Sequence, residues 1–269
     1  MSVSEAHLRE MYLDLMRDIL INEIYKDPPL RRSISAKLMS AVGIQTRHEA
    51  GGLFDDKRRE LGLDWPSQAH TMIGKQRLEN LRMAACAVIE QGVPGDMVET
   101  GVWRGGACIL MRAILKAYGD TDRTVYVCDS FAGLPEPDDA YEADKGDTHH
   151  TVQVLAVSEE QVKDNFRAYG LLDDQVKFLV GWFKDTLPKA PIDAVSVLRL
   201  DGDMYESTMD GLMALYHKVS PGGYVIVDDY HAVPGCKAAV HDYLETHFPD
   251  ETVDIVEIDG TGVYWVRKA

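Results

Sequence analysis

The feature that most constrains the fold is a regular alternation of strand-like and helix-like segments from residue 96 onward. Short runs of β-branched and other apolar residues predict buried strands, and apolar residues at helical spacing predict helices between most of them. The predicted strands are 96–102, 124–128, 176–180, 194–200 and 224–227, and the predicted helices are 105–118, 158–169, 206–218 and 236–247. Near-continuous apolar strands alternating with helices are typical of a parallel sheet covered on both faces. We therefore predict an α/β fold with a doubly wound, mostly parallel sheet.

The two ends of the chain depart from this alternation. Residues 252–258 and 263–267 are joined by Asp-Gly-Thr-Gly, which is hairpin turn chemistry, so the last two strands should be antiparallel. A helix is expected over about residues 5–25, where Asp27-Pro28-Pro29 stops it, and another over 70–91. Between them, the weak periodicity of about 30–65 fits either short helices or a mobile cover.

The domain organisation follows from these segments. We expect an N-terminal helical cover over residues 1–65 and one main domain over 66–269. The connection 131–157 is long and rich in Asp, Glu, Gly and Pro, and it leaves the predicted ligand edge of the sheet. It is either a lid over a binding site or a disordered insert.

Charge and hydropathy exclude several partners. The chain has 44 Asp and Glu against 28 Lys and Arg, a formal charge of −16, which disfavours a nucleic-acid partner. No apolar run reaches the roughly 20 residues of a membrane span, and the first residues lack the order of a signal peptide. We therefore expect a soluble, cytoplasmic protein without a membrane partner. The four cysteines have no metal-ligand spacing and are interpreted as buried thiols.

Ligands of doubly wound sheets lie beyond the carboxyl ends of the strands, so the residues that follow each strand are the candidates for a binding site. The first strand runs into Glu99-Thr100-Gly101-Val102-Trp103-Arg104-Gly105-Gly106, a glycine-bearing turn that opens a helix. The middle glycine of G-x-G-x-x-G is absent, and Trp103 and Arg104 would crowd a pyrophosphate, which disfavours NAD or FAD. S-adenosylmethionine needs no phosphate site. An ordinary strand-to-helix turn is the alternative.

Acidic residues follow three further strands. Asp129 ends the second strand, where a carboxylate can hold ribose hydroxyls or simply cap a turn. Asp201 and Asp203 follow one later strand, and Asp228 and Asp229 follow the next. Adjacent parallel strands lie about 5 Å apart, so these acids should converge and favour Mg²⁺, Mn²⁺ or Ca²⁺ over zinc. Solvated loop acids and a helix cap remain the alternative.

Four histidines lie near the predicted loops. His70, His149, His150 and His231 have no visible partner in the sequence, so we interpret them as solvated loop residues rather than as bases or substrate contacts.

Five runs of residues together resemble the macrocin O-methyltransferase family of sugar O-methyltransferases from antibiotic biosynthesis. They are HTMIGKQRLENL (70–81), VPGDMVETGVWRGGACI (93–109), YGLLDDQVKFLVGWFKDTLP (169–188), LRLDGDMYESTMD (198–210) and SPGGYVIVDDY (220–230). The resemblance covers about residues 65–267. It implies the class I S-adenosylmethionine-dependent methyltransferase fold, which is Rossmann-like, with S-adenosylmethionine as donor, Mg²⁺ as cofactor and a homodimeric protein.

The resemblance also implies site residues. It places metal ligands at Asp201, Asp228 and Asp229, and the general base at Asp203. The implied catalytic residues are Asp203 and Asp201. The implied donor site comprises Thr71, Met72, Ile73, Glu99, Thr100, Gly101, Trp103, Gly105, Asp129, Ser130, Gly181, Trp182 and Phe183.

The sequence thus predicts a Mg²⁺-dependent methyltransferase that acts on a deoxysugar hydroxyl of a glycosylated natural product. One alternative is an enzyme for a catechol-like or other vicinal diol. The others are a dinucleotide- or nucleotide-sugar-binding Rossmann protein and a non-catalytic binding module.

Overall fold

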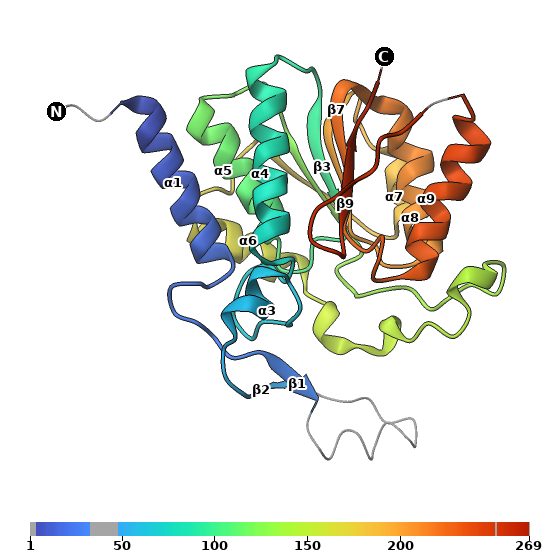
Figure 1. Ribbon diagram of the computed structural model, residues 1–269, viewed down its shortest axis with the longest axis horizontal. Helices are drawn as coiled ribbons and strands as arrows, with labels where there is room; N and C mark the ends of the chain where they lie inside the picture. The colour runs from blue at the N-terminus through green and yellow to red at the C-terminus, as the bar shows by residue number, and fades with distance from the viewer. Residues whose placement is uncertain (1–3, 33–47, 251, 269) are drawn as a thin grey trace.

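The computed structural model describes residues 4–32, 48–250 and 252–268, and it is built around a seven-stranded sheet (Figure 1). The strand order is β5-β4-β3-β6-β7-β9-β8. The strands are β3 (Asp96–Thr100), β4 (Val125–Asp129), β5 (Val176–Val180), β6 (Val195–Leu200), β7 (Val219–Val227), β8 (Val256–Glu257) and β9 (Val263–Val266). The first five pair in parallel, and β9 is antiparallel to both β7 and β8. The predicted parallel sheet with an antiparallel end is confirmed.

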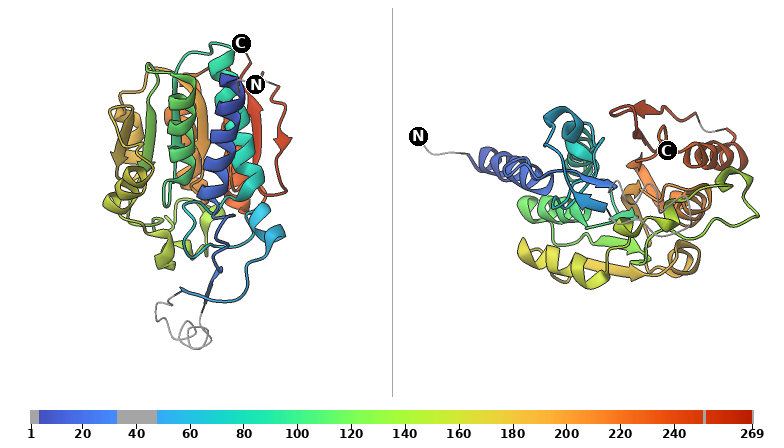
Figure 2. Two further views of the ribbon diagram at one scale, coloured as in Figure 1. Left: turned by 90° about the vertical axis from the view of Figure 1, so that its left-hand side faces the viewer. Right: turned by 90° about the horizontal axis from the view of Figure 1, so that it is seen from below.

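Helices cover both faces of the sheet (Figure 2). One core packs around Leu78, Ile109 and Phe166, and the other packs around Leu212 and Trp265. The first face carries α1 (Glu5–Leu20), α4 (Gly74–Glu90), α5 (Gly106–Tyr118) and α6 (Glu159–Ala168), and the second carries α7 (Phe183–Thr186), α8 (Tyr205–Leu215) and α9 (Pro234–His247). Among the described residues, no helix is both long and apolar enough to cross a membrane.

The N-terminal segment differs in detail from the expectation. Helix α1 ends at Leu20 rather than near residue 25, because Asn22 takes a left-handed φ of 55° well before the prolines. The part between the helices contains α3 (Asp56–Glu60) and a two-stranded antiparallel ribbon of β1 (Leu30–Arg32) and β2 (His48–Ala50), which the sequence did not indicate. Residues 33–47 lie outside the described residues.

A buried arginine holds this N-terminal segment together. Arg59 Nη1 donates to Asp27 Oδ1 at 2.8 Å and to the Ile21 carbonyl at 2.6 Å, and its Nη2 donates to Asp64 Oδ2 at 3.0 Å. Helix α1 itself packs against α4 and α5. The charged network therefore joins parts of the segment to one another, and α1 attaches the segment to the helices on one face of the sheet.

The connection 131–157 contains three short 3-10 turns: η1 (Glu142–Asp144), η2 (His149–Thr151) and η3 (Gln153–Leu155). Figure 1 shows this segment, α3 and the ribbon at the same end of the molecule, below the carboxyl ends of the parallel strands. Because η1 packs against α8 and α9, the segment crosses the edge at which a ligand is expected.

Candidate active site

A cavity of about 430 Å³ opens at the carboxyl edge of the sheet. Twelve of the predicted donor-site, metal-ligand and catalytic residues line it: Met72, Gly101, Trp103, Asp129, Ser130, Gly181, Trp182, Phe183, Asp201, Asp203, Asp228 and Asp229. Met72 lies just before α4, and the other eleven lie at or after the carboxyl ends of the five parallel strands, as the aligned ends of such strands require.

The other predicted donor-site residues, Thr71, Ile73, Glu99, Thr100 and Gly105, are not in the cavity lining. Both Glu99 oxygens already have partners, Arg199 Nη1 at 2.5 Å and Cys108 Sγ at 2.8 Å. Gly105 takes a φ of +83° directly before α5, where a side chain would press on Val162. The structure therefore does not bring these five residues into the cavity lining.

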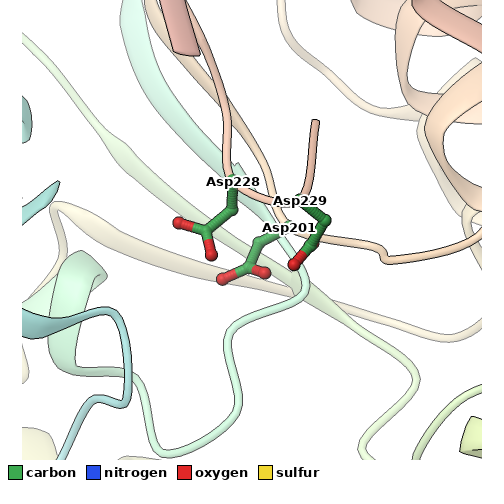
Figure 3. Close-up of side chains that lie close together, drawn as sticks. All are labelled: Asp201, Asp228 and Asp229. Atoms are coloured by element: carbon green, nitrogen blue, oxygen red, sulfur yellow. The ribbon is translucent and has the colours of Figure 1, made fainter. Parts of the chain in front are cut away.

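Three carboxylates meet at the ends of β6 and β7. Oxygens of Asp201, Asp228 and Asp229 lie within 4.8 Å of one another, and Figure 3 shows the side chains gathered below the strand ends. Asp229 Oδ2 is buried and has no hydrogen-bond partner among the described residues. A buried carboxylate oxygen without a donor is costly, and a hard divalent cation is the group that satisfies such an oxygen. The donor set therefore fits Mg²⁺.

Two buried arginines compensate part of this negative charge. Arg199, in β6, donates to Asp201 Oδ2 at 2.7 Å and also pairs with Asp228. Arg77, in α4, pairs with the other oxygen of Asp228 and donates to Asp259 Oδ2 at 2.8 Å. The carboxylate of Asp228 is thus fixed between two guanidinium groups.

Burial dominates the protonation behaviour of the acids. Burial, and then the nearby Asp228 carboxylate, raises the pKa of Asp201. Burial, and then Asp201, raises the pKa of Asp203 to about 7, and burial raises the pKa of Glu99 to about 7 although Arg199 favours its ionised form. The pKa of Asp229 lies well above its usual value because of burial and the neighbouring Asp203. Close carboxylates in a buried site retain protons unless a cation compensates them.

The opposite part of the cavity is formed by the ends of β4 and β5. Asp129 Oδ2 accepts from the Val102 amide at 2.8 Å, and Asp129 Oδ1 accepts from the Phe131 amide at 2.7 Å. Each oxygen keeps a further lone pair for a ligand hydroxyl. The side chain of Trp182, which is 37% exposed, offers an aromatic surface in the same lining. This part suits a nucleoside.

The histidines separate into different environments. His149 lines the cavity with its side chain 36% exposed, and its Nδ1 lies 2.8 Å from Asp147 Oδ2. His70 is largely buried with its Nδ1 2.7 Å from the Tyr169 hydroxyl, so the solvated interpretation was wrong for His70. His231 pairs with Glu257 at 3.0 Å. His150 is exposed.

Sequence reasoning missed Arg77 and Arg199 and set His149 aside. A usable signal existed for Arg199, because a charged residue within the apolar strand VLRL requires a buried countercharge. Arg77 lies in a helix where arginine is common, and its partners are distant in sequence, so no local pattern identifies it.

Comparisons with known proteins agree with this geometry. Residues 9–268 match the family Macrocin-O-methyltransferase (TylF). The chain is 54% identical over 259 residues to Demethyldecarbamoylnovobiocin O-methyltransferase of Streptomyces niveus, covering 96% of this chain and 93% of the relative. It is 51% identical over 263 residues to 8-demethyl-8-(2,3-dimethoxy-alpha-L-rhamnosyl)-tetracenomycin-C 4'-O-methyltransferase of Streptomyces olivaceus, covering 97% and 94%. It is 47% identical over 264 residues to Mycinamicin III 3''-O-methyltransferase of Micromonospora griseorubida, covering 97% of each.

Among solved structures, the O-methyltransferase NovP superposes with a TM-score of 0.87 at 52% identity, covering 97% of this chain and 100% of that one. The calicheamicin methyltransferase CalS11 superposes with a TM-score of 0.57 at 18% identity, covering 78% and 90%, and shares the fold. These likenesses confirm the class I methyltransferase fold expected from the sequence.

Proposed function

Because the chain belongs to the Macrocin-O-methyltransferase (TylF) family, it is an O-methyltransferase, and we propose that it methylates a deoxysugar hydroxyl of a glycosylated natural product. The proposed donor is S-adenosylmethionine and the proposed metal is Mg²⁺. The names of the relatives support this acceptor class, since one of them includes a rhamnosyl group and a 4'-O position.

The observation that carries the proposal is the cluster of three carboxylates, those of Asp201, Asp228 and Asp229, which line a cavity of about 430 Å³. Ligand cavities are commonly about 300–1,000 Å³, so this cavity has the size of a small-molecule site. When bound, Mg²⁺ supplies a centre that holds two vicinal hydroxyls and lowers the pKa of one of them. The ion pairs with Arg77 and Arg199 fix the orientation of the Asp228 carboxylate, which supports its proposed role as a ligand.

The chain's own residues would divide the remaining work. Asp129 would accept hydrogen bonds from the donor's ribose, and Trp182 would contact its base. Asp203, next to the metal-ligand position, would take the proton of the acceptor hydroxyl. The segment 131–157 would exclude water, which matters because methyl transfer from a cationic donor depends on alignment more than on a strong base.

The test is calorimetric titration of the purified protein with Mg²⁺ and, separately, with S-adenosylhomocysteine or NAD. We expect binding of Mg²⁺ and of S-adenosylhomocysteine, and none of NAD. Asp201→Asn should lose the Mg²⁺ isotherm while remaining folded by circular dichroism. Asp174→Asn, in the exposed turn before β5, is the matched control and should bind as the wild type does. Unchanged Mg²⁺ binding in Asp201→Asn would refute the metal assignment.

The acceptor class is tested separately, with Mg²⁺ and S-adenosylmethionine present. A glycosylated polyketide or aminocoumarin should be methylated, and the same compound without its sugar should not. A catechol is the second candidate acceptor, because a metal ion held by the three carboxylates would also bind its two adjacent hydroxyls. Methylation of the catechol at a comparable kcat/KM would favour that alternative.

We also propose a homodimer that pairs through α1. Helix α1 lies at the edge of the molecule (Figure 1). Its apolar residues Leu8, Met11, Leu15 and Ile19 are exposed among the described residues. An apolar stripe on one helix is self-complementary about a two-fold axis. Light scattering should give twice the mass of one chain, and Leu15→Glu should halve it. Met213→Glu, at an exposed apolar residue of α8, should leave the mass unchanged.

Two further sequence predictions remain proposals. They are the division into a cover at residues 1–65 and a main domain at 66–269, and the cytoplasmic location. Limited proteolysis tests the first, since cleavage concentrated between α3 and α4 would leave a stable fragment that begins near residue 66.

A further inference from the structure

A single buried carboxylate attaches the segment 131–157 to α8. Asp144, in η1, is 3% exposed, and its oxygens accept from the amides of Tyr205 at 2.6 Å and Glu206 at 2.9 Å. These are the first two amides of α8, which lack partners inside the helix. The residue at the N-cap position, Met204, has a thioether that is a poor acceptor. The helix cap is therefore supplied from 61 residues earlier in the chain.

We propose that Asp144 is a positioning residue: by capping α8 from the segment 131–157, it fixes the loop that carries Asp201 and Asp203. This inference rests on the proposed function, because it assigns those two acids to the reaction. The loop is short, running from the end of β6 at Leu200 to the start of α8 at Tyr205. Its first residue is held at β3 by the Asp201 amide, which donates to the Thr100 carbonyl at 2.9 Å. The Asp144 cap holds the other end.

The backbone of the loop needs support at both ends. Asp203 has a φ of 59°, the left-handed region that costs a non-glycine residue roughly 1–2 kcal/mol. Such a conformation persists only where the surrounding structure determines it. An uncapped first turn of α8 would fray, and the loop would then relax toward ordinary conformations that no longer present Asp203 to the cavity.

The contact around Asp144 is closely packed. A Cβ at Gly235, in the first turn of α9, would lie 2.9 Å from Asp144 Oδ1, so this glycine permits the approach. The rings of Tyr141 and Tyr205 lie 5.6 Å apart, and the Tyr205 hydroxyl donates to Asp242 Oδ2 at 2.9 Å. The segment 131–157, α8 and α9 thus meet at one point.

The same attachment directs the next residues into the cavity. The Asp147 amide donates to the Asp144 carbonyl at 3.0 Å, and Asp147 in turn holds His149, which lines the cavity with Asp203. Release of Asp144 would therefore withdraw His149 and uncap α8 in one movement. The position of the segment and the geometry of the acid loop are coupled through this residue.

The experiment compares Asp144→Ala with Asp144→Asn. In Asp144→Ala, peptides spanning residues 200–210 and 140–150 should exchange amide hydrogens faster in the absence of any ligand. Mg²⁺ binding should weaken by about tenfold, the factor that corresponds to one helix cap, because fewer molecules hold the competent loop. The turnover number should fall while the KM for S-adenosylmethionine stays within about twofold, since Asp129 ends β4 and Trp182 follows β5. Asp144→Asn keeps one of the two acceptor oxygens and should restore part of each property.

Two control variants separate positioning from general destabilisation. Glu142→Ala lies in the same 3-10 turn and removes an exposed ion pair with Lys145. Ser4→Ala removes a helix cap of the same kind from α1, where Ser4 Oγ accepts from the His7 amide at 3.2 Å. Both should leave Mg²⁺ affinity and exchange at residues 200–210 unchanged.

Unchanged exchange and unchanged Mg²⁺ affinity in Asp144→Ala would overturn the proposal. If that variant does not fold, Gly235→Ala tests the same contact by crowding Asp144, and it should show the same changes at smaller amplitude. If the wild type binds no Mg²⁺, the proposed metal fails. The exchange comparison between Asp144→Ala, Asp144→Asn and Glu142→Ala still decides whether the cap fixes the loop.

Discussion

At the scale of single residues, Arg199 is central to the buried charges of the site. It pairs with Glu99, Asp201 and Asp228, and all but Asp201 are almost completely buried. Arg199→Met leaves these acids without their common partner, so we expect the free energy of unfolding in urea to fall by about 3–5 kcal/mol.

The control for this prediction is Arg167→Met. Arg167 also pairs with two carboxylates, those of Glu160 and Asp164, but on the exposed surface of α6. Exposed pairs contribute little, so the free energy of unfolding should change far less than in Arg199→Met. Equal losses in the two variants would contradict the role assigned to Arg199.

His70 provides a pH dependence that is separate from the acid cluster. Burial, and then the charge of Arg104, lowers the pKa of His70 below its usual value of 6.5. The folded state therefore keeps the imidazole neutral, while the unfolded chain takes up a proton below about pH 6.5. The contribution of His70 to stability is complete above that pH and is lost progressively as the pH falls below it.

Between about pH 7 and pH 5, the free energy of unfolding in urea should fall less for His70→Gln than for the wild type. Gln can keep the hydrogen bond to the Tyr169 hydroxyl without titrating. His7→Gln, on the exposed part of α1, should follow the wild type. Identical pH profiles for His70→Gln and the wild type would show that His70 titrates alike in the folded and unfolded states.

Some residues of the site could be predicted from the sequence and others could not, for physical reasons. The acids at 129, 201, 203, 228 and 229 follow strands directly, so strand alternation alone places them at one edge. Arg77 is brought to Asp228 across 151 positions by tertiary packing, which no local pattern encodes. Asp144 was hidden for the same reason.

At the scale of elements, the ends of β3 and β6 approach so closely that only glycine fits between them. A Cβ on Gly101, where φ is +82°, would lie 1.7 Å from the Asp201 carbonyl oxygen. Gly101→Ala should therefore lower the free energy of unfolding by on the order of 3 kcal/mol or more, and it should displace the acid loop. Urea unfolding and soluble yield measure the effect.

Gly92→Ala is the matched control for this prediction. Gly92 also has a positive φ, +65°, but a Cβ there meets nothing within 4 Å. Only the backbone conformation is penalised, by roughly 1–2 kcal/mol. A loss at Gly92 as large as that at Gly101 would mean that conformation, rather than the close approach of the strands, makes glycine necessary.

Elements with a clear period were predicted, and short elements were not. Strands β3 to β7 and helices α5, α6, α8 and α9 correspond to the predicted segments. The ribbon strands β1 and β2 contain three residues each, too few to show an alternation. The end of α1 was set by a left-handed residue, Asn22, rather than by the more visible prolines.

At the scale of the whole molecule, the formal charge of −16 surrounds a site that itself gathers carboxylates. The resulting field attracts cations, and salt screens it. Raising the ionic strength from about 0.01 to about 0.1 M shortens the Debye length from about 30 to about 10 Å. We therefore expect the dissociation constant for Mg²⁺ to rise several-fold in calorimetry, whereas that for S-adenosylhomocysteine should change little. An unchanged Mg²⁺ constant would mean that the distant charges do not act on the site.

The order of the strands was only partly predictable. Alternation predicts a parallel sheet, and the turn at 259–262 predicts an antiparallel pair, but the insertion of β9 between β7 and β8 is a matter of long-range pairing. Local sequence patterns indicate which segments are strands, and the packing of the entire chain determines which strands are neighbours.

The position of β9 has a consequence for biosynthesis on the ribosome. Strand β7, whose end carries Asp228 and Asp229, has an unpaired edge until β9, the last strand to emerge, aligns along it. Asp259, in the turn before β9, then pairs with Arg77, which also pairs with Asp228. A nascent chain stalled before that turn would contain every proposed metal ligand without a formed metal site, and its open strand edge would be a target for chaperones or for aggregation.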